Sequence, residues 1–174
     1  MDMIGSDSIA ILPTASISIR NRDVEFPFRP DSDFFYLTGY PEPEAVVVLI
    51  PDREEGECIL FCRERDEKME AWHGRRSGLE GAIKIYAADD AFPIEDMDDI
   101  LPGLIEGHER IYYNMGSDQN FDQRVLGWVN QIRDKVRTGA TAPDEFISLN
   151  HFLHEMRLYK SRYEIKLMRK AAEI

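Results

Sequence analysis

The chain has 174 residues, enough for one domain with a hydrophobic core and a short further segment. Hydrophobic residues make up 43% and charged residues 31%, a balance typical of globular rather than disordered proteins. No stretch approaches the roughly 20 apolar residues of a membrane-spanning helix, and the net charge of -12 argues against binding to nucleic acid or anionic lipid. The first residues carry acid where a secretory signal would carry base, so we expect a cytoplasmic protein.

Apolar segments predict four β-strands, the first of which is residues 8–12 (SIAIL). The strongest segment is residues 45–50 (AVVVLI), which is apolar on both faces and therefore suits an interior strand of a covered sheet. A short polar loop connects it to residues 58–62 (CILFC), so these two strands should pair antiparallel. The fourth predicted strand is residues 111–113 (IYY).

Both cysteines lie in the CILFC strand, about 13 Å apart along an extended chain and beyond disulfide reach. Cys58 and Cys62 should therefore be buried thiols on one face of the sheet. The sequence supplies no further zinc ligands near them at the usual spacing.

Apolar residues three and four apart predict amphipathic helices over residues 94–104 and 121–132. Strands that come first in pairs and then alternate with helices indicate an α/β fold, a mixed β-sheet flanked by helices. We expect this domain to occupy residues 1–148.

The remaining residues, 149–174, are expected to form a linker helix and the truncated start of a second domain. A helix over residues 149–158 breaks near Tyr159, and a capping box, Ser161 to Glu164, begins another. That helix reaches Ile174 without a stop signal, which indicates a chain cut in mid-helix.

The sequence contains no self-contained active site. The nucleophile elbow, phosphate loop, dinucleotide fingerprint and HExxH zinc helix are all absent. His151 and His154 stand three apart without an evident third metal ligand. The acidic residues between 89 and 99 lack the ligand rhythm of a calcium loop, which favours a solvated helix start over a cation site. We therefore expect no metal site in this chain.

Two segments are unusual in composition. Residues 22–50 (RDVEFPFRPDSDFFYLTGYPEPEAVVVLI) place a polar, turn-rich loop directly before an aromatic strand. Residues 70–78 (EAWHGRRSG) have the composition of an exposed recognition loop. Composition alone favours the plainer interpretations, an aromatic core and a solvated turn.

These segments, with TAP at 141–143 and HEMRLYKSRYEIKLMRKAAEI at 154–174, resemble the amino-terminal domain of aminopeptidase P, in the creatinase and prolidase superfamily. The resemblance runs from about Ser8 through the whole chain, although the usual helix before the first strand is absent or shortened. It implies a metal-dependent hydrolase that releases the amino-terminal residue before proline. The catalytic pita-bread domain, with two divalent ions, usually manganese, held by two Asp, one His and two Glu, would be missing here, and this fragment would be inactive.

The resemblance also implies three substrate-binding residues. Trp72 matches an aromatic residue that reaches into an active site, including that of a neighbouring subunit in tetramers; its indole offers an apolar face to proline. Asp23 and Arg137 match positions near the site entrance, where the alternative is a surface ion pair worth about 0 to 1 kcal/mol. The domain would thus shape the substrate site of a homo-oligomer, a dimer or tetramer. The alternative function is a stand-alone peptide- or protein-binding module without catalysis.

Overall fold

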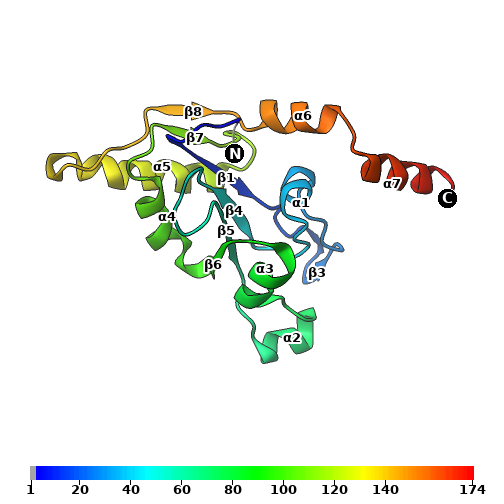
Figure 1. Ribbon diagram of the computed structural model, residues 1–174. Coiled ribbons are helices and arrows are strands. Elements are labelled where there is room, and N and C mark those ends of the chain that lie inside the picture. The colour runs from blue at the N-terminus through cyan, green and yellow to red at the C-terminus, as the bar shows by residue number, and fades with distance from the viewer. Residues whose placement is uncertain (1–2) are drawn as a thin grey trace.

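The computed structural model describes residues 3–174, which form a six-stranded mixed sheet with helices on both faces (Figure 1). The sheet has the order β6-β5-β4-β1-β7-β8. Its strands are β1 (Ser8–Pro13), β4 (Val46–Leu49), β5 (Cys58–Cys62), β6 (Asp90–Pro93), β7 (Arg110–Tyr112) and β8 (Glu145–Ile147). A separate two-stranded ribbon consists of β2 (Ile19–Asn21) and β3 (Val24–Glu25).

The described residues also contain seven α-helices and two short 3-10 helices. They are α1 (Ser32–Thr38), α2 (Glu67–His73), α3 (Gly78–Tyr86), η1 (Ile94–Asp96), α4 (Met97–Ile105), α5 (Gln119–Asp134), η2 (Val136–Thr138), α6 (Asn150–Leu158) and α7 (Arg162–Ala172), of which α6 and α7 follow the last strand. The predicted α/β class, a mixed sheet flanked by helices, is confirmed.

The predicted interior strand and its hairpin partner are confirmed. β4 pairs antiparallel with β1 on one side and with β5 on the other, and Val47 faces Leu60 across the hairpin. The remaining pairs, β1 with β7, β7 with β8 and β5 with β6, are parallel. Because β4 is covered on both faces, Val47 is only 1% exposed.

Alternate residues of the strands enter two hydrophobic clusters, one on each face of the sheet. Val46 and Val48 point to the face covered by α4 and α5, whereas Val47 points to the face covered by α1, α3 and α6. Cys62 is buried on the second face, and Cys58 is half-buried against the same cluster. The two thiols therefore share a face as predicted, but only one of them is fully buried.

The aromatic strand predicted within residues 22–50 is wrong, because the aromatic residues 34–36 lie in helix α1. The carboxylate of Asp31 accepts hydrogen bonds from the backbone N–H groups of Asp33 and Phe34, both at 2.9 Å, and so caps the helix. Gly39 ends it in the left-handed region at φ 64°. Of the helix's aromatic side chains only Phe34 is buried, which is the one-sided burial of a helix against a sheet.

The predicted capping box at Ser161 is confirmed. Its hydroxyl accepts from the N–H of Glu164 at 3.2 Å, and the Glu164 carboxylate accepts from the N–H of Ser161 at 2.7 Å. The helix that follows, α7, extends away from the sheet and has no buried side chain among the described residues (Figure 1). In α6, by contrast, Leu153 packs into the second cluster. The predicted division after residue 148 stays a prediction.

Within residues 3–174, none of the helices combines the length and the apolar character that crossing a bilayer requires.

Candidate functional site

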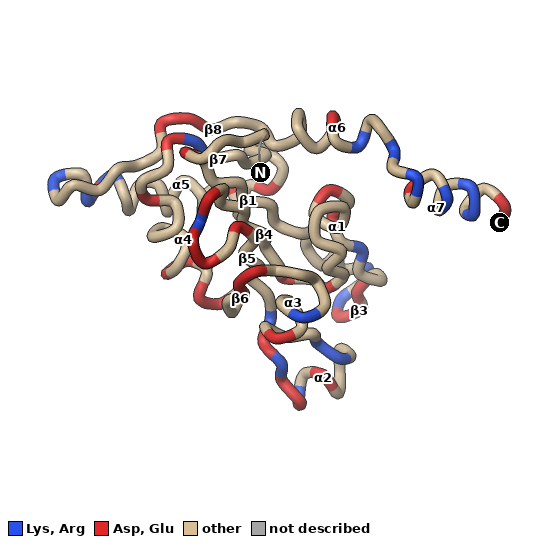
Figure 2. The backbone as a smooth tube through the Cα atoms, viewed as in Figure 1, with Lys and Arg blue, Asp and Glu red and all other residues tan. Residues whose placement is uncertain are grey.

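Helix α2 projects from the body of the domain. The chain leaves the sheet at the end of β5, runs out to α2 at the lowest point of Figure 1 and returns to start α3. We call residues 64–76 the α2 projection. Charged residues of both signs lie along it (Figure 2), and no side chain of α2 itself is buried in the described structure.

The projection is helical because both ends of a very short segment are capped. Asp66 Oδ1 accepts hydrogen bonds from the N–H groups of Lys68 and Met69, at 2.9 and 3.2 Å. Gly74, at φ 86°, donates its N–H to the carbonyl of Glu70 at 3.0 Å. These caps let seven residues hold a helix without core contacts.

Trp72 is 84% exposed, as the composition of residues 70–78 indicates. The expected loop is wrong up to His73, however, because these residues belong to the capped helix α2. An indole held this far out contributes almost nothing to packing. It presents a broad apolar face and one N–H donor to whatever approaches the projection.

An ion pair joins the helix to the loop that precedes it. Arg65 Nε lies 3.1 Å from Glu70 Oε1, and Arg65 Nη2 donates to Oε2 at 3.3 Å. These two hydrogen bonds hold the pKa of the Glu70 carboxyl below its ordinary value. The Glu70 side chain is therefore ionised and anchored at neutral pH.

The other two predicted site residues lie elsewhere. Asp23 is exposed in the turn between β2 and β3. Arg137 is exposed in η2, in the yellow segment after α5 at the far left of Figure 1. Within residues 3–174, no hydrogen bond or ion pair joins either of them to Trp72 or to each other. The three residues lie on three different elements, α2, the β2–β3 turn and η2.

The described residues do not fit a metal centre. No group of three or more His, Cys, Asp or Glu side chains is arranged to hold an ion anywhere in residues 3–174. His151 and His154 are both exposed on α6. In the acidic stretch, Asp90 pairs with Arg53 at 3.2 Å, while Asp98 accepts from the Trp128 indole at 2.8 Å. The carboxylates of Asp90 and Asp98 therefore bind other side chains of the domain.

Residues at the base of the projection were not identified from the sequence. The carboxylate of Glu42 binds Ser77, 35 residues further along the chain. No local pattern links a glutamate in a proline-rich turn to a serine at the start of a distant helix. Only the fold brings them together.

Comparison with known proteins identifies close relatives. The family model for the aminopeptidase P N-terminal domain matches residues 1–112. The Xaa-Pro aminopeptidase of Escherichia coli K12 is 38% identical over 168 residues, and the match covers 96% of this chain and 38% of that protein. The mitochondrial intermediate cleaving peptidase 55 of Arabidopsis thaliana is 32% identical over 174 residues, with 100% of this chain and 33% of that protein covered.

Solved structures agree with these matches. Pseudomonas aeruginosa aminopeptidase PepP superimposes with a TM-score of 0.96 at 60% sequence identity. That match covers 99% of this chain and 39% of the PepP chain. The chain thus spans well under half the length of the relatives that it matches.

Proposed function

The chain belongs to the family of aminopeptidase P N-terminal domains, and we propose that it serves as the non-catalytic domain of a Xaa-Pro aminopeptidase. In this proposal the complete enzyme is a metal-dependent hydrolase that releases the residue preceding proline. The domain shapes the substrate site and the oligomer. The names of the relatives support the reaction, and the chain's share of their length leaves room for a separate catalytic part.

The observation that carries the proposal is the position of Trp72. A tryptophan that is 84% exposed at the tip of a capped helix can reach beyond its own domain. Proline as the second residue forms a tertiary amide with a rigid ring, so a site that selects it needs a matching apolar surface. The face of the indole supplies such a surface.

Asp23 and Arg137 are proposed as further substrate-site residues at the entrance. They lie on different elements from Trp72, and in this proposal another domain or a second copy of the chain brings all three into one site. We therefore include a homo-oligomer in the proposal. The divalent ions, manganese by family resemblance, would belong to the catalytic part, because residues 3–174 contain no group of three or more side chains arranged to hold an ion.

The test is the change Trp72→Ala in the complete enzyme. We expect the specificity constant for Xaa-Pro peptides to fall by about tenfold or more, as for the loss of an aromatic anchor at a binding site. Ile85→Ala is the matched control, because Ile85 is also apolar and 69% exposed but lies on α3. Equal kinetics for wild type and Trp72→Ala would contradict the proposal.

A second measurement distinguishes the proposed function from the alternative, a stand-alone binding module. If the 174-residue chain alone bound Xaa-Pro peptides, a stand-alone binding module would be favoured over a domain that completes an enzyme. The cytoplasmic location stays a prediction, and one relative is named as mitochondrial.

A further inference from the structure

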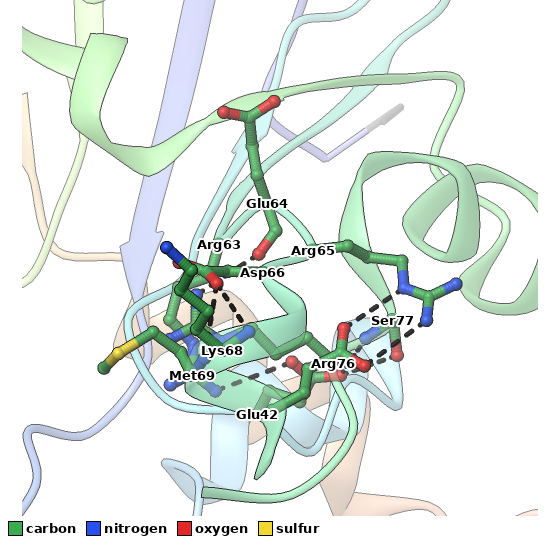
Figure 3. Close-up of polar contacts among 10 residues, drawn as sticks. Glu42, Arg63, Glu64, Arg65, Asp66, Lys68, Met69, Arg76 and Ser77 are labelled. Atoms are coloured by element: carbon green, nitrogen blue, oxygen red, sulfur yellow. Dashed lines mark hydrogen bonds and ion pairs between the residues drawn. The ribbon is translucent and has the colours of Figure 1, made fainter. Parts of the chain in front are cut away.

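A single carboxylate joins the two ends of the α2 projection. Glu42, in the loop between α1 and β4, accepts hydrogen bonds from the backbone N–H and the hydroxyl of Ser77 at 2.7 and 2.6 Å. Its other oxygen lies 3.6 Å from Nη2 of Arg63. Arg63 directly follows β5 and Ser77 directly precedes α3. Glu42 therefore contacts both the segment that enters the projection and the segment that leaves it (Figure 3).

The same two segments are joined again one residue further from the sheet. Arg76 Nη1 donates to the backbone carbonyl of Glu64 at 3.2 Å. Gly78 packs so closely on Arg65 that a Cβ at position 78 would lie 2.5 Å from the Arg65 Cγ. The base of the projection is therefore a closed, paired stem, and Glu42 lies at its inner end.

The carboxylate of Glu42 is largely buried together with its charged partner. Its side chain is 13% exposed and that of Arg63 is 12% exposed, so both charges are largely removed from water and depend on each other. Hydrogen bonds to an ionised acceptor are stronger than neutral ones, and the negative charge lies at the favourable amino-terminal end of α3. Glu44 also approaches Arg63, at 3.5 Å, but is 58% exposed.

Helix α2 has no buried residue, so its direction depends on the contacts at the base of the projection. These are the contacts of Glu42 with Arg63 and Ser77, the Arg65–Glu70 pair and the hydrogen bond from Arg76 to Glu64. We propose that Glu42 is a positioning residue that sets the direction of the α2 projection and thereby the place of Trp72. The functional importance of that placement rests on the proposed role of Trp72. The placement itself does not, and it can be tested on the chain alone.

The experiment measures hydrogen exchange of the 174-residue chain for wild type, Glu42→Gln and Glu42→Ala. We expect amides of residues 66–74 to exchange about tenfold faster in Glu42→Ala, since the Ser77 donors and the Arg63 charge lose their partner. Glu42→Gln keeps an acceptor for Ser77 and should give a smaller increase. Glu80→Gln is the control, because Glu80 is exposed on α3 and its one ion pair within residues 3–174 is with Lys84.

A second readout follows the indole directly. In a Trp128→Phe background, Trp72 is the sole tryptophan, and its fluorescence anisotropy should fall in Glu42→Ala at temperatures well below unfolding. A residue that only stabilises the fold would lower the melting temperature and leave this anisotropy unchanged.

Two outcomes overturn the proposal. One is unaltered exchange in residues 66–74 in Glu42→Ala, and the other is an increase of equal size in α4 and α5, which would show general destabilisation. In the complete enzyme, the Glu42→Ala and Trp72→Ala losses should be non-additive, because both act through the indole. If Trp72→Ala had no kinetic effect while Glu42→Ala still loosened the projection, the proposed function would fail and the positioning role of Glu42 would stand.

Discussion

The two tryptophans of the chain provide a matched pair for testing burial against exposure. Trp128, on α5, is 2% exposed, whereas Trp72 is 84% exposed. The Trp128 ring meets Phe121 edge-on with centroids 5.7 Å apart, and its indole N–H donates to Asp98 at 2.8 Å. The guanidinium of Arg124 lies 5.6 Å from the same ring. The same truncation to alanine should therefore have very different consequences at the two positions.

For Trp128→Ala we expect a loss of about 3 to 5 kcal/mol in the free energy of unfolding, the usual range for a buried aromatic side chain. Losing the indole hydrogen bond to Asp98 adds little to this free-energy loss, because the Asp98 carboxylate keeps its hydrogen bond from Arg124 at 3.0 Å. For Trp72→Ala the expected change is within about 0.5 kcal/mol, since exposed substitutions rarely exceed that. Against a total stability of about 5 to 15 kcal/mol, only the first change should be conspicuous.

The assay is urea denaturation of the 174-residue chain followed by far-ultraviolet circular dichroism, with the slopes compared before the midpoints are interpreted. Trp128→Phe is the control that keeps an aromatic ring against Phe121, and it should lose less than Trp128→Ala. A loss above about 2 kcal/mol for Trp72→Ala would refute the reasoning. It would mean that the indole packs against the domain and is not available to a substrate.

Three further predictions concern the sheet, a helix end and the thiols. Val47→Asp should lower the free energy of unfolding by several kcal/mol, because it places an unpaired charge at a position 1% exposed; thermal unfolding equal to wild type would contradict this. Asp118→Ala should cost about 1 kcal/mol in chemical denaturation, because its carboxylate caps α5. Burial raises the pKa of Cys58 and Cys62 from 9.0 to about 11, so the unfolded chain loses these protons first and stability should fall as pH rises from about 9 to about 11. Replacing both cysteines with alanine should flatten that part of the pH profile.

The elements predicted correctly from the sequence are those whose burial leaves a long or repeated signal. Examples are the apolar, β-branched run of β4 and the apolar residues that recur every three or four positions along the 16-residue helix α5. β6 and β8 were not predicted, because they have four and three residues and neither is a continuous apolar run. Their place at the two edges of the sheet is set by parallel pairing with β5 and β7, which no local pattern encodes.

Helix α1 shows how a local preference is overridden. Adjacent aromatic residues favour strands, and residues 34–36 contain three of them. The flanking caps, Asp31 and Gly39, decide the outcome, together with a sheet face that accepts Phe34 and leaves its two neighbours partly exposed. The two caps therefore outweigh the strand preference of the aromatic residues.

The exposure of Trp72 followed from the glycines and arginines around it, but the helix that carries it did not. Seven residues are too few for apolar periodicity to be recognised, and the caps at Asp66 and Gly74 supply the order instead. The anchoring of the projection was still less predictable, because Glu42 and Ser77 are far apart in sequence.

The anchoring is informative because an exposed aromatic side chain is ordinarily a liability. A solvent-exposed indole favours non-specific association and contributes nothing to the core, so packing alone gives no reason for its position. A flexible loop would suffice if the segment were only a connection between β5 and α3. Instead the chain closes a paired stem beneath it, with a largely buried carboxylate at its inner end and a capped helix at its tip. Such order reduces the entropy that Trp72 would lose on binding, which is an advantage only if the indole meets a partner in a defined position.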